Sequence, residues 1–191
     1  MARFTVLPRT YFNRPTLTVA RSLIGKYLVR ENGKGLVAGK IIEVEAYVGP
    51  RDKACHASKG RTPRTDVLFG PPGISYVYLI YGMYHCLNVV TEREEFPAAV
   101  LIRAVEVDGE LIDGPGRLCR TLEIDRSLDR LDMTSGKYLW FEDRGTNIPR
   151  GEIGMFPRIG VDYAREWAKK PWRFRLQALS GPKGRKVGLR Q

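Results

Sequence analysis

The spacing of apolar residues changes repeatedly along the chain and predicts short helices mixed with strands. Leu17, Ala20 and Leu23 recur at helical spacing, and Gly25 is expected to end this helix. Two further short helices are expected, one within residues 113–124 and one within residues 161–170. A proline at position 171 ends the last of them, because it cannot continue a helix.

Segments rich in β-branched and aromatic residues predict the strands. They span residues 35–49, 74–91, 98–107, 137–143 and 172–176. Gly82 interrupts the second segment, which is therefore expected to fold as a β-hairpin. Residues 50–73 are expected to be mostly loop, and residues 180–191 to be a frayed or disordered basic tail. Because strands and helices are interspersed without regular βαβ spacing, we expect an α+β fold with a mixed or antiparallel sheet.

Length and composition are those of one folded domain. The chain has 191 residues, 43% of them hydrophobic, and no break in composition divides it, so we expect a single domain over residues 1–191. No apolar run reaches the roughly 20 residues that a membrane helix requires. The N-terminus lacks the pattern of a secretory signal, and three scattered cysteines make no disulfide framework. These features predict a cytoplasmic protein.

The charge balance favours a polyanionic partner. The formal net charge is +11, from 32 Lys and Arg against 21 Asp and Glu. Basic residues cluster within 51–64 and within 165–190. A soluble enzyme with a basic surface would also have this composition, but the clustering favours nucleic acid binding, with an affinity that falls as salt rises.

The first predicted strand carries candidate catalytic side chains. Alternation along it places Glu43, Glu45 and Tyr47 on one face, with successive residues of that face roughly 7 Å apart. Such a row is commonly the solvated face of a half-buried sheet, and the functional alternative is a general base beside an aromatic wall. Arg103 interrupts another apolar strand, where a buried guanidinium needs an anion such as one of these glutamates. An edge position, with the guanidinium reaching solvent, explains Arg103 equally well.

The hairpin segment is unusually rich in tyrosine. Its four tyrosines are Tyr76, Tyr78, Tyr81 and Tyr84. Such segments usually contribute to a core, but Tyr81 adjoins Gly82 at the expected hairpin tip, where small polar residues are usual. A large apolar side chain there, on a basic protein, suits insertion between base pairs. Neither a metal nor a cofactor is expected, because the His and Cys spacings do not match a zinc site and no glycine-rich phosphate loop is present.

Several longer motifs, in order, resemble the alkyladenine (3-methylpurine) DNA glycosylase family, of the mammalian methylpurine glycosylase type in a compact bacterial form. They are "IGKYLVR", "GKIIEVEAYVGPRDKACHA", "GRTPR", "PPGISYVYLIYGMYHCLN", "AVLIRAVE", "DGPGRLC" and "REWAKKPWRFR". The resemblance implies a monomer that acts in base-excision repair on double-stranded DNA containing damaged purines, and that is associated with the nucleoid. It would flip the damaged purine into a pocket and hydrolyse the N-glycosidic bond, leaving an abasic site without strand cleavage. The segment after Val107 is shorter than in many family members, which puts some scaffold and phosphate contacts in question.

The resemblance also implies roles for individual residues. Glu45 corresponds to the general base that activates water, and Arg103 to its partner, together with the backbone carbonyl of Ile159. The positions of the substrate-base pocket are Ala46, Tyr47, His56, Tyr78, Asn88 and Ile159, among which Asn88 would disfavour the exocyclic amine of normal guanine. The DNA-binding positions are Arg61, Thr62, Arg64, Tyr81, Met83 and Tyr84, with Tyr81 as the wedge that fills the gap left by the flipped base. The family's substrates include 3-methyladenine, 7-methylguanine, hypoxanthine and ethenoadenine.

Two other functions fit the same residues. In a non-catalytic module, Tyr47, Tyr78 and Tyr81 would form a stacking platform for single-stranded nucleic acid. Glu45 argues against that alternative, because a carboxylate in the middle of a polyanion site repels phosphate. An enzyme that modifies RNA in a similar pocket is the third hypothesis, and a comparison of duplex DNA with RNA of the same sequence would separate it.

Overall fold

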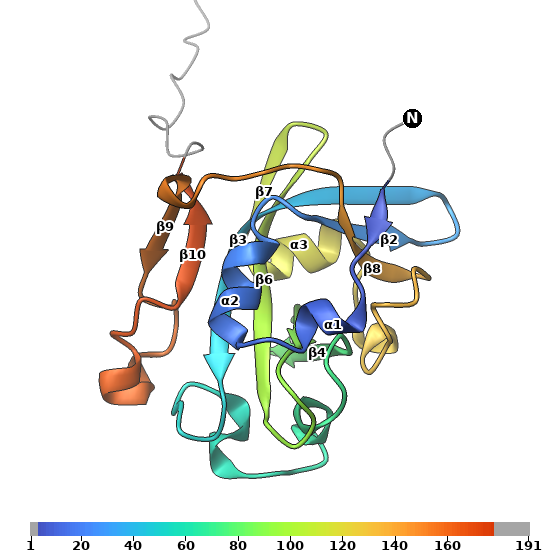
Figure 1. The fold of residues 1–191 in the computed structure, drawn as a ribbon. Coiled ribbons are helices and arrows are strands. Elements are labelled where there is room, and N and C mark those ends of the chain that lie inside the picture. The colour runs from blue at the N-terminus through green and yellow to red at the C-terminus, as the bar shows by residue number, and fades with distance from the viewer. Residues whose placement is uncertain (1–3, 178–191) are drawn as a thin grey trace, which may run out of the picture.

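The structure is a computed structural model that describes residues 4–177, and its ten strands form one sheet (Figure 1). The strands are β1 (Thr5–Val6), β2 (Tyr27–Glu31), β3 (Leu36–Val48), β4 (Ser75–Ile80), β5 (Tyr84–Val90), β6 (Ala98–Val107), β7 (Glu110–Asp113), β8 (Leu139–Asp143), β9 (Ile153–Phe156) and β10 (Arg173–Leu176). Their order is β1-β8-β2-β3-β6-β5-β4, with β7 beside β6 and the β9–β10 pair beside β3. All these pairings are antiparallel. The expected α+β fold is confirmed, and the expected tail at 180–191 lies outside the described residues.

Helices and helical turns are short, as the apolar spacing predicts. The α-helices are α1 (Arg9–Phe12), α2 (Thr16–Leu23) and α3 (Pro115–Thr121). The 3₁₀ turns are η1 (His56–Lys59), η2 (Asp66–Phe69), η3 (Arg126–Leu128), η4 (Arg150–Glu152) and η5 (Asp162–Trp167). The helix expected within 161–170 is thus a 3₁₀ segment, kinked where Arg165 takes a φ of 55°. Between residues 4 and 177 no helix is long and apolar enough to cross a membrane.

The long strand β3 organises the molecule. Its 13 residues pair with β6 along one edge, and two strands share the other edge. There β2 pairs with residues 36–40 and β10 pairs with residues 43–45. The register of β3 against β6 shifts on both sides of Glu43, which marks a β-bulge. Between its flanking strands, β3 is buried without interruption from Ile41 to Ala46.

Two clusters of buried side chains bear on the site. The main core contains Leu23 of α2, which packs on β3 and lies in front of it in Figure 1, together with side chains of β3, β5, β6 and α3. A second cluster joins η1 and η2 to the sheet through Cys55, Ala57, Val67, Leu68, Tyr76, Val90 and Ala99. Tyr47 and Tyr78 pack against this second cluster, so the loop region between β3 and β4 is fixed against the sheet where the tyrosines lie.

Candidate active site

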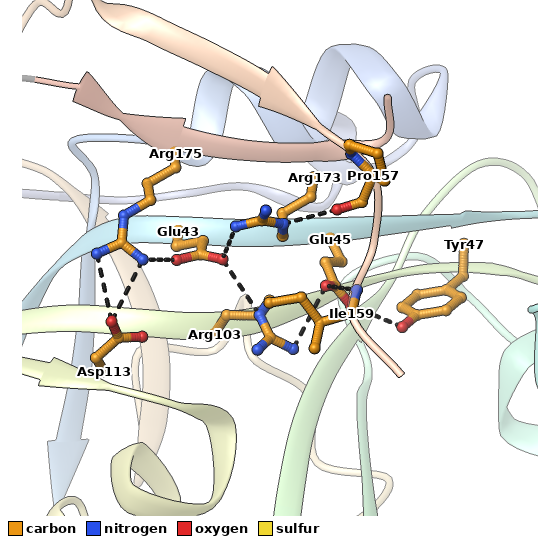
Figure 2. Close-up of polar contacts among 9 residues, drawn as sticks. All are labelled: Glu43, Glu45, Tyr47, Arg103, Asp113, Pro157, Ile159, Arg173 and Arg175. Atoms are coloured by element: carbon orange, nitrogen blue, oxygen red, sulfur yellow. Dashed lines mark hydrogen bonds and ion pairs between the residues drawn. The ribbon is translucent and has the colours of Figure 1, made fainter. Parts of the chain in front are cut away.

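Glu45 has no solvent exposure, and Figure 2 shows the polar groups that contact its carboxylate. Its Oε1 accepts a hydrogen bond of 2.9 Å from the backbone N–H of Ile159, and its Oε2 accepts one of 2.8 Å from the phenol of Tyr47. Nη1 of Arg103 lies 3.4 Å from Oε1 as an ion-pair contact. The carboxylate therefore has a partner on each oxygen: Tyr47 from its own strand, Arg103 from β6, and Ile159 from a segment far along the chain. The resemblance implied the carbonyl of Ile159, whereas the group that contacts Glu45 is the amide of that residue.

Glu43 is buried beside Glu45, with only 1% exposure. Its Oε1 accepts hydrogen bonds from Nε of Arg103 at 3.3 Å and from Nη1 of Arg173 at 2.9 Å. Nη1 of Arg175 contacts the other oxygen, and this arginine also pairs with Asp113 at 3.3 Å. The reading of the glutamate row as a solvated face is therefore wrong. The interpretation of Arg103 as an edge residue that reaches solvent is also wrong, because its side chain is only 12% exposed and lies between the two glutamates.

Burial dominates the ionisation of Glu45 and Tyr47. Desolvation raises the pKa of Glu45 above the usual carboxyl range, and Arg103, the Ile159 amide and the Tyr47 hydroxyl partly offset that rise. Desolvation, reinforced by the Glu45 charge, raises the pKa of Tyr47 far above that of a free phenol. Tyr47 therefore remains a hydrogen-bond donor. Pairing with Arg103 alone would have suggested a carboxyl that loses its proton readily, but burial is the larger effect.

A pocket opens beside this carboxylate. It is lined by Tyr47, Ala54, Cys55, His56, Leu68, Tyr76, Tyr78, Asn88 and Ala99. The rings of His56 and Tyr78 meet edge to face, with centroids 4.7 Å apart, and the rings of Tyr76 and Tyr78 are 5.2 Å apart. Tyr47, His56, Tyr78 and Asn88 thus converge on one cavity. Ala46 does not line it, because alternation along β3 turns its side chain into the main core.

Hydrogen bonding fixes the ring of His56. Nδ1 lies 2.9 Å from the hydroxyl of Tyr76, which also accepts a bond of 3.1 Å from Nε of Arg64. The buried Tyr76 proton needs an acceptor, and Nδ1 is the one within reach among the described residues, so the imidazole carries its proton on Nε2. Burial, and secondarily the charge of Arg64, lowers the pKa of His56 to about 4. His56 is therefore a neutral ring at neutral pH.

Asn88 is buried in the same wall of the pocket. Its Nδ2 donates to the carbonyl of Tyr76 at 3.1 Å, across the paired strands β4 and β5. This bond fixes the plane of the amide and leaves its oxygen and second N–H free to meet a ligand.

The tip of the β4–β5 hairpin presents a bare aromatic ring. Tyr81 is 82% exposed and has a φ of 53°, followed by Gly82 with a φ of 70°. The N–H of Met83 closes the turn onto the carbonyl of Ile80 at 3.2 Å. Positive φ at both central residues is the requirement of a type I′ turn, which a tyrosine satisfies only at a cost. Met83 is also exposed, and so is Tyr84, at 38%, although part of its ring packs beside Gly116 of α3.

The other expected DNA contacts are partly engaged within the protein. Arg61 pairs with Asp66 at 2.8 Å and with Glu95 at 3.0 Å. Thr62 bonds to Thr65 within a turn. The guanidinium of Arg64 lies 5.1 Å from the centroid of the Tyr78 ring, at the pocket wall.

A buried ion pair between Arg158 and Asp52 packs against the Tyr47 wall of the pocket, and the sequence patterns did not reveal it. Arg158 donates to both carboxylate oxygens of Asp52, at 2.6 and 2.9 Å, and both side chains are completely buried. The same guanidinium lies 4.9 Å from the centroid of the Tyr47 ring and bonds to the carbonyl of Ala46 at 2.9 Å. Asp52 also accepts the backbone N–H groups of Val48 and Ala54. Asp52 lies in the predicted loop 50–73, and Arg158 lies in a segment for which no element was predicted, so alternation gave no signal for either residue.

Comparisons with known proteins place the chain in a family. The family described as methylpurine-DNA glycosylase matches residues 10–179. A protein of Methanocella arvoryzae named "Putative 3-methyladenine DNA glycosylase" is 52% identical over 185 residues, covering 88% of this chain and 91% of its own. Proteins with the same name are 49% identical in Myxococcus xanthus, covering 87% and 88% of the two chains, and 49% identical in Legionella pneumophila (strain Corby), covering 90% and 94%. The chain therefore belongs to the methylpurine-DNA glycosylase family.

Proposed function

We propose that the protein removes alkylated and deaminated purines from double-stranded DNA by hydrolysis of the N-glycosidic bond, with Glu45 as the general base. The observation that carries this proposal is a completely buried carboxylate beside an aromatic pocket on a basic protein. Burying a carboxylate is costly unless it has partners, and here Arg103, Ile159 and Tyr47 supply them. Repair of 3-methyladenine, which the names of the relatives describe, fits the same site.

The pocket has the chemistry to hold a damaged purine. Tyr47, His56 and Tyr78 all line the pocket. With Tyr47 on one side and His56 and Tyr78 on the other, as the resemblance implies, a flipped base would stack between aromatic rings. A purine that carries a positive charge after alkylation gains a cation–π contribution of about 0.5–2 kcal/mol there. The neutral state of His56 is needed for this, since an imidazolium would repel a cationic base. Asn88 would reject normal guanine by leaving its exocyclic amine facing a donor.

The carboxylate has room for one more hydrogen bond. Each oxygen of an ionised carboxylate accepts about two. Oε1 is used by Ile159 and Arg103, whereas Oε2 holds only Tyr47. A water that binds at Oε2 could give its proton to Glu45 as it attacks the sugar carbon. The same negative charge would stabilise the oxocarbenium-like transition state, as in glycoside hydrolysis.

The hairpin tip would hold the base in its flipped state. The exposed ring of Tyr81 can enter the stack in place of the extruded nucleotide, while the paired strands β4 and β5 fix its position relative to Tyr78 and Asn88. No lysine lines the pocket among the described residues. We therefore propose simple hydrolysis that leaves an abasic site, without a Schiff base or strand cleavage.

Excision assays test the proposal. Purified protein is incubated, without added metal, with a duplex that contains one hypoxanthine or ethenoadenine, and hot alkali then reveals abasic sites. Release of 3-methyladenine from methylated DNA is measured in parallel, because this base leaves most readily. Glu45→Gln should abolish excision and keep or strengthen DNA binding, since it removes a charge that repels phosphate.

Each outcome is decisive. Excision by the wild type alone supports Glu45 as the base. Excision by Glu45→Gln at the wild-type rate would refute that role. Tight binding without release of any of the three bases would favour the non-catalytic stacking module.

A further inference from the structure

Arg173, on the strand β10, contacts Glu43 and the backbone of Pro157, and each of these lies next to a group that contacts Glu45 (Figure 2). It lies directly opposite Glu45 in the register of β10 with β3. Its Nη1 donates to Oε1 of Glu43 at 2.9 Å, and its Nε donates to the carbonyl of Pro157 at 2.8 Å. One guanidinium thus makes two bonds with different atoms, in two segments that are more than 100 positions apart.

The first bond acts on Arg103. Oε1 of Glu43 is shared by Arg173 and by Nε of Arg103. The bond to Nε orients the Arg103 guanidinium so that Nη1 faces Glu45. Two further positive charges, on Arg173 and Arg175, reach Glu43. Arg103 therefore does not have to neutralise Glu43 alone and keeps its charge available to Glu45.

The second bond acts on Ile159. Pro157 lies two residues before Ile159, whose N–H donates to Glu45. Between them, Arg158 is held by the buried Asp52. With Pro157 tied to Arg173, the segment is fixed at two consecutive residues immediately before the amide that must point at the carboxylate.

We infer that Arg173 is a positioning residue for the excision reaction, acting on Glu45 through Glu43 and Arg103 on one side and through Pro157 and Ile159 on the other. This inference rests on the proposed function. It assigns Arg173 no contact with the purine or the reacting atoms. The role depends on the forked shape of the guanidinium, because its Nε and Nη1 donate at the same time to Pro157 and to Glu43.

The ionisation of Glu45 offers a readout that a purely structural role would not move. The groups that face Glu45 are Tyr47 on β3, Arg103 on β6, Tyr78 and Cys86 on the hairpin, the Ile159 amide with Arg158, and Glu43 with Arg173. Loss of the Arg173 charge leaves Glu43 less neutralised and draws Arg103 toward it. The pKa of Glu45 then rises, and the acid limb of the excision profile moves to higher pH.

The test compares three variants in single-turnover excision across pH. Arg173→Gln should slow excision by about tenfold or more, since misplacing a catalytic group by an ångström costs on this scale, and should move the acid limb to higher pH. Arg173→Lys keeps the charge but cannot serve both acceptors, so its rate should fall while the acid limb stays. Arg175→Gln is the matched control: it also contacts Glu43 but does not reach Pro157, and its loss should be several-fold smaller. Thermal unfolding and the affinity for lesion-containing DNA are measured for each.

The results separate this inference from the proposed function. An active wild type whose rate and acid limb are unchanged by Arg173→Gln would overturn the positioning role and leave the glycosylase intact. A wild-type excision rate in Arg173→Lys would show that only the positive charge is needed, and this result would also overturn the positioning role. A wild type that excises none of the three lesions would overturn the proposed function. In that case, a titration of the Glu45 carboxyl by carbon NMR still decides whether Arg173→Gln raises its pKa. If Arg173→Gln does not fold, the lysine variant carries the test.

Discussion

The phenol of Tyr47 donates a hydrogen bond of 2.8 Å to Oε2 of Glu45, two positions away on the same strand. This bond joins the aromatic wall of the pocket to the carboxylate proposed as the base. It also pre-orders both side chains, because neither can turn without breaking a bond in a site that excludes solvent. The ring that would stack on the base and the group that would activate water are therefore one unit.

Tyr47→Phe should narrow the pH range of activity without removing the pocket wall. The hydroxyl lowers the pKa of Glu45 against the larger effect of burial, so its loss raises that pKa further. Because a base must be ionised, activity grows as pH rises through this pKa, and the acid limb should move to higher pH. A hydrogen bond to a charged group contributes about 1.5–3 kcal/mol, so its loss should be visible in the pH profile.

The check is a pH profile of single-turnover excision for the wild type and for Tyr47→Phe. Tyr47→Ala is the control, since it removes the ring as well and should lose activity at every pH. Coincident profiles for the wild type and the phenylalanine variant would show that the hydroxyl does not tune the base.

Tyr81→Gly should stabilise the protein and impair its function at the same time. The φ of 53° is strained for tyrosine, and a left-handed conformation costs a residue with a side chain about 1–2 kcal/mol. Glycine adopts it freely. The free energy of unfolding should therefore rise by about 1 kcal/mol, while excision from duplex DNA falls because the wedge is lost.

Urea unfolding and excision measured on the same preparations test this opposition. Tyr81→Ala is the matched variant, because it loses the ring but keeps the strain. It should lose excision as the glycine variant does, without the gain in stability. Normal excision by both variants would remove Tyr81 from the mechanism.

Lys59 and Arg61 should contribute differently to the salt dependence of DNA binding. Lys59 ends the turn that begins with His56, is exposed, and forms no ion pair within the described part of the chain. Arg61 is already paired with Asp66 and Glu95. If Lys59 meets a phosphate, Lys59→Gln should reduce the slope of log affinity against log salt by about 0.9, and Arg61→Gln should reduce it by less. Equal changes, or none, would contradict this division of the basic cluster.

Local patterns were sufficient where neighbours on one strand make the contact. Alternation placed Glu45 beside Tyr47, and the glycine after Tyr81 marked the hairpin tip. The main strands and the helix α2 lie where the apolar spacing predicts them, whereas α1 was not predicted. These features depend on periods of two or 3.6 residues, which are written in the sequence itself.

Contacts between distant segments were beyond such reasoning. Whether the glutamate row faces water or the interior depends on contacts from β10, which pairs with residues 43–45 of β3 and brings Arg173 and Arg175 to Glu43. The amide of Ile159 and the Arg158–Asp52 pair belong to segments with no periodic signal. Their positions follow from the docking of loops onto the sheet, which a local pattern does not encode.

His56 should make the protein less stable in mild acid. Burial, followed by the charge of Arg64, lowers the pKa of this imidazole from 6.5 to about 4. Below pH 6.5 the unfolded chain binds a proton that the folded protein does not accept until near pH 4. The free energy of unfolding therefore falls as the pH drops through this window, by about 2 kcal/mol at pH 5.

Urea unfolding at pH 7 and pH 5 measures this loss, which His56→Gln should remove. His85→Gln is the matched control: it removes the other histidine of the chain, keeps His56, and should keep the loss. The same experiment bears on function, because the pocket is suited to a cationic purine only while His56 is uncharged. If His56→Gln lost as much stability between pH 7 and pH 5 as the wild type does, the folded pocket would accept a protonated imidazole at position 56. In that case, excision of 7-methylguanine should weaken more between pH 7 and pH 5 in the wild type than in His56→Gln, because both keep Glu45 but only the wild type gains a charged imidazole.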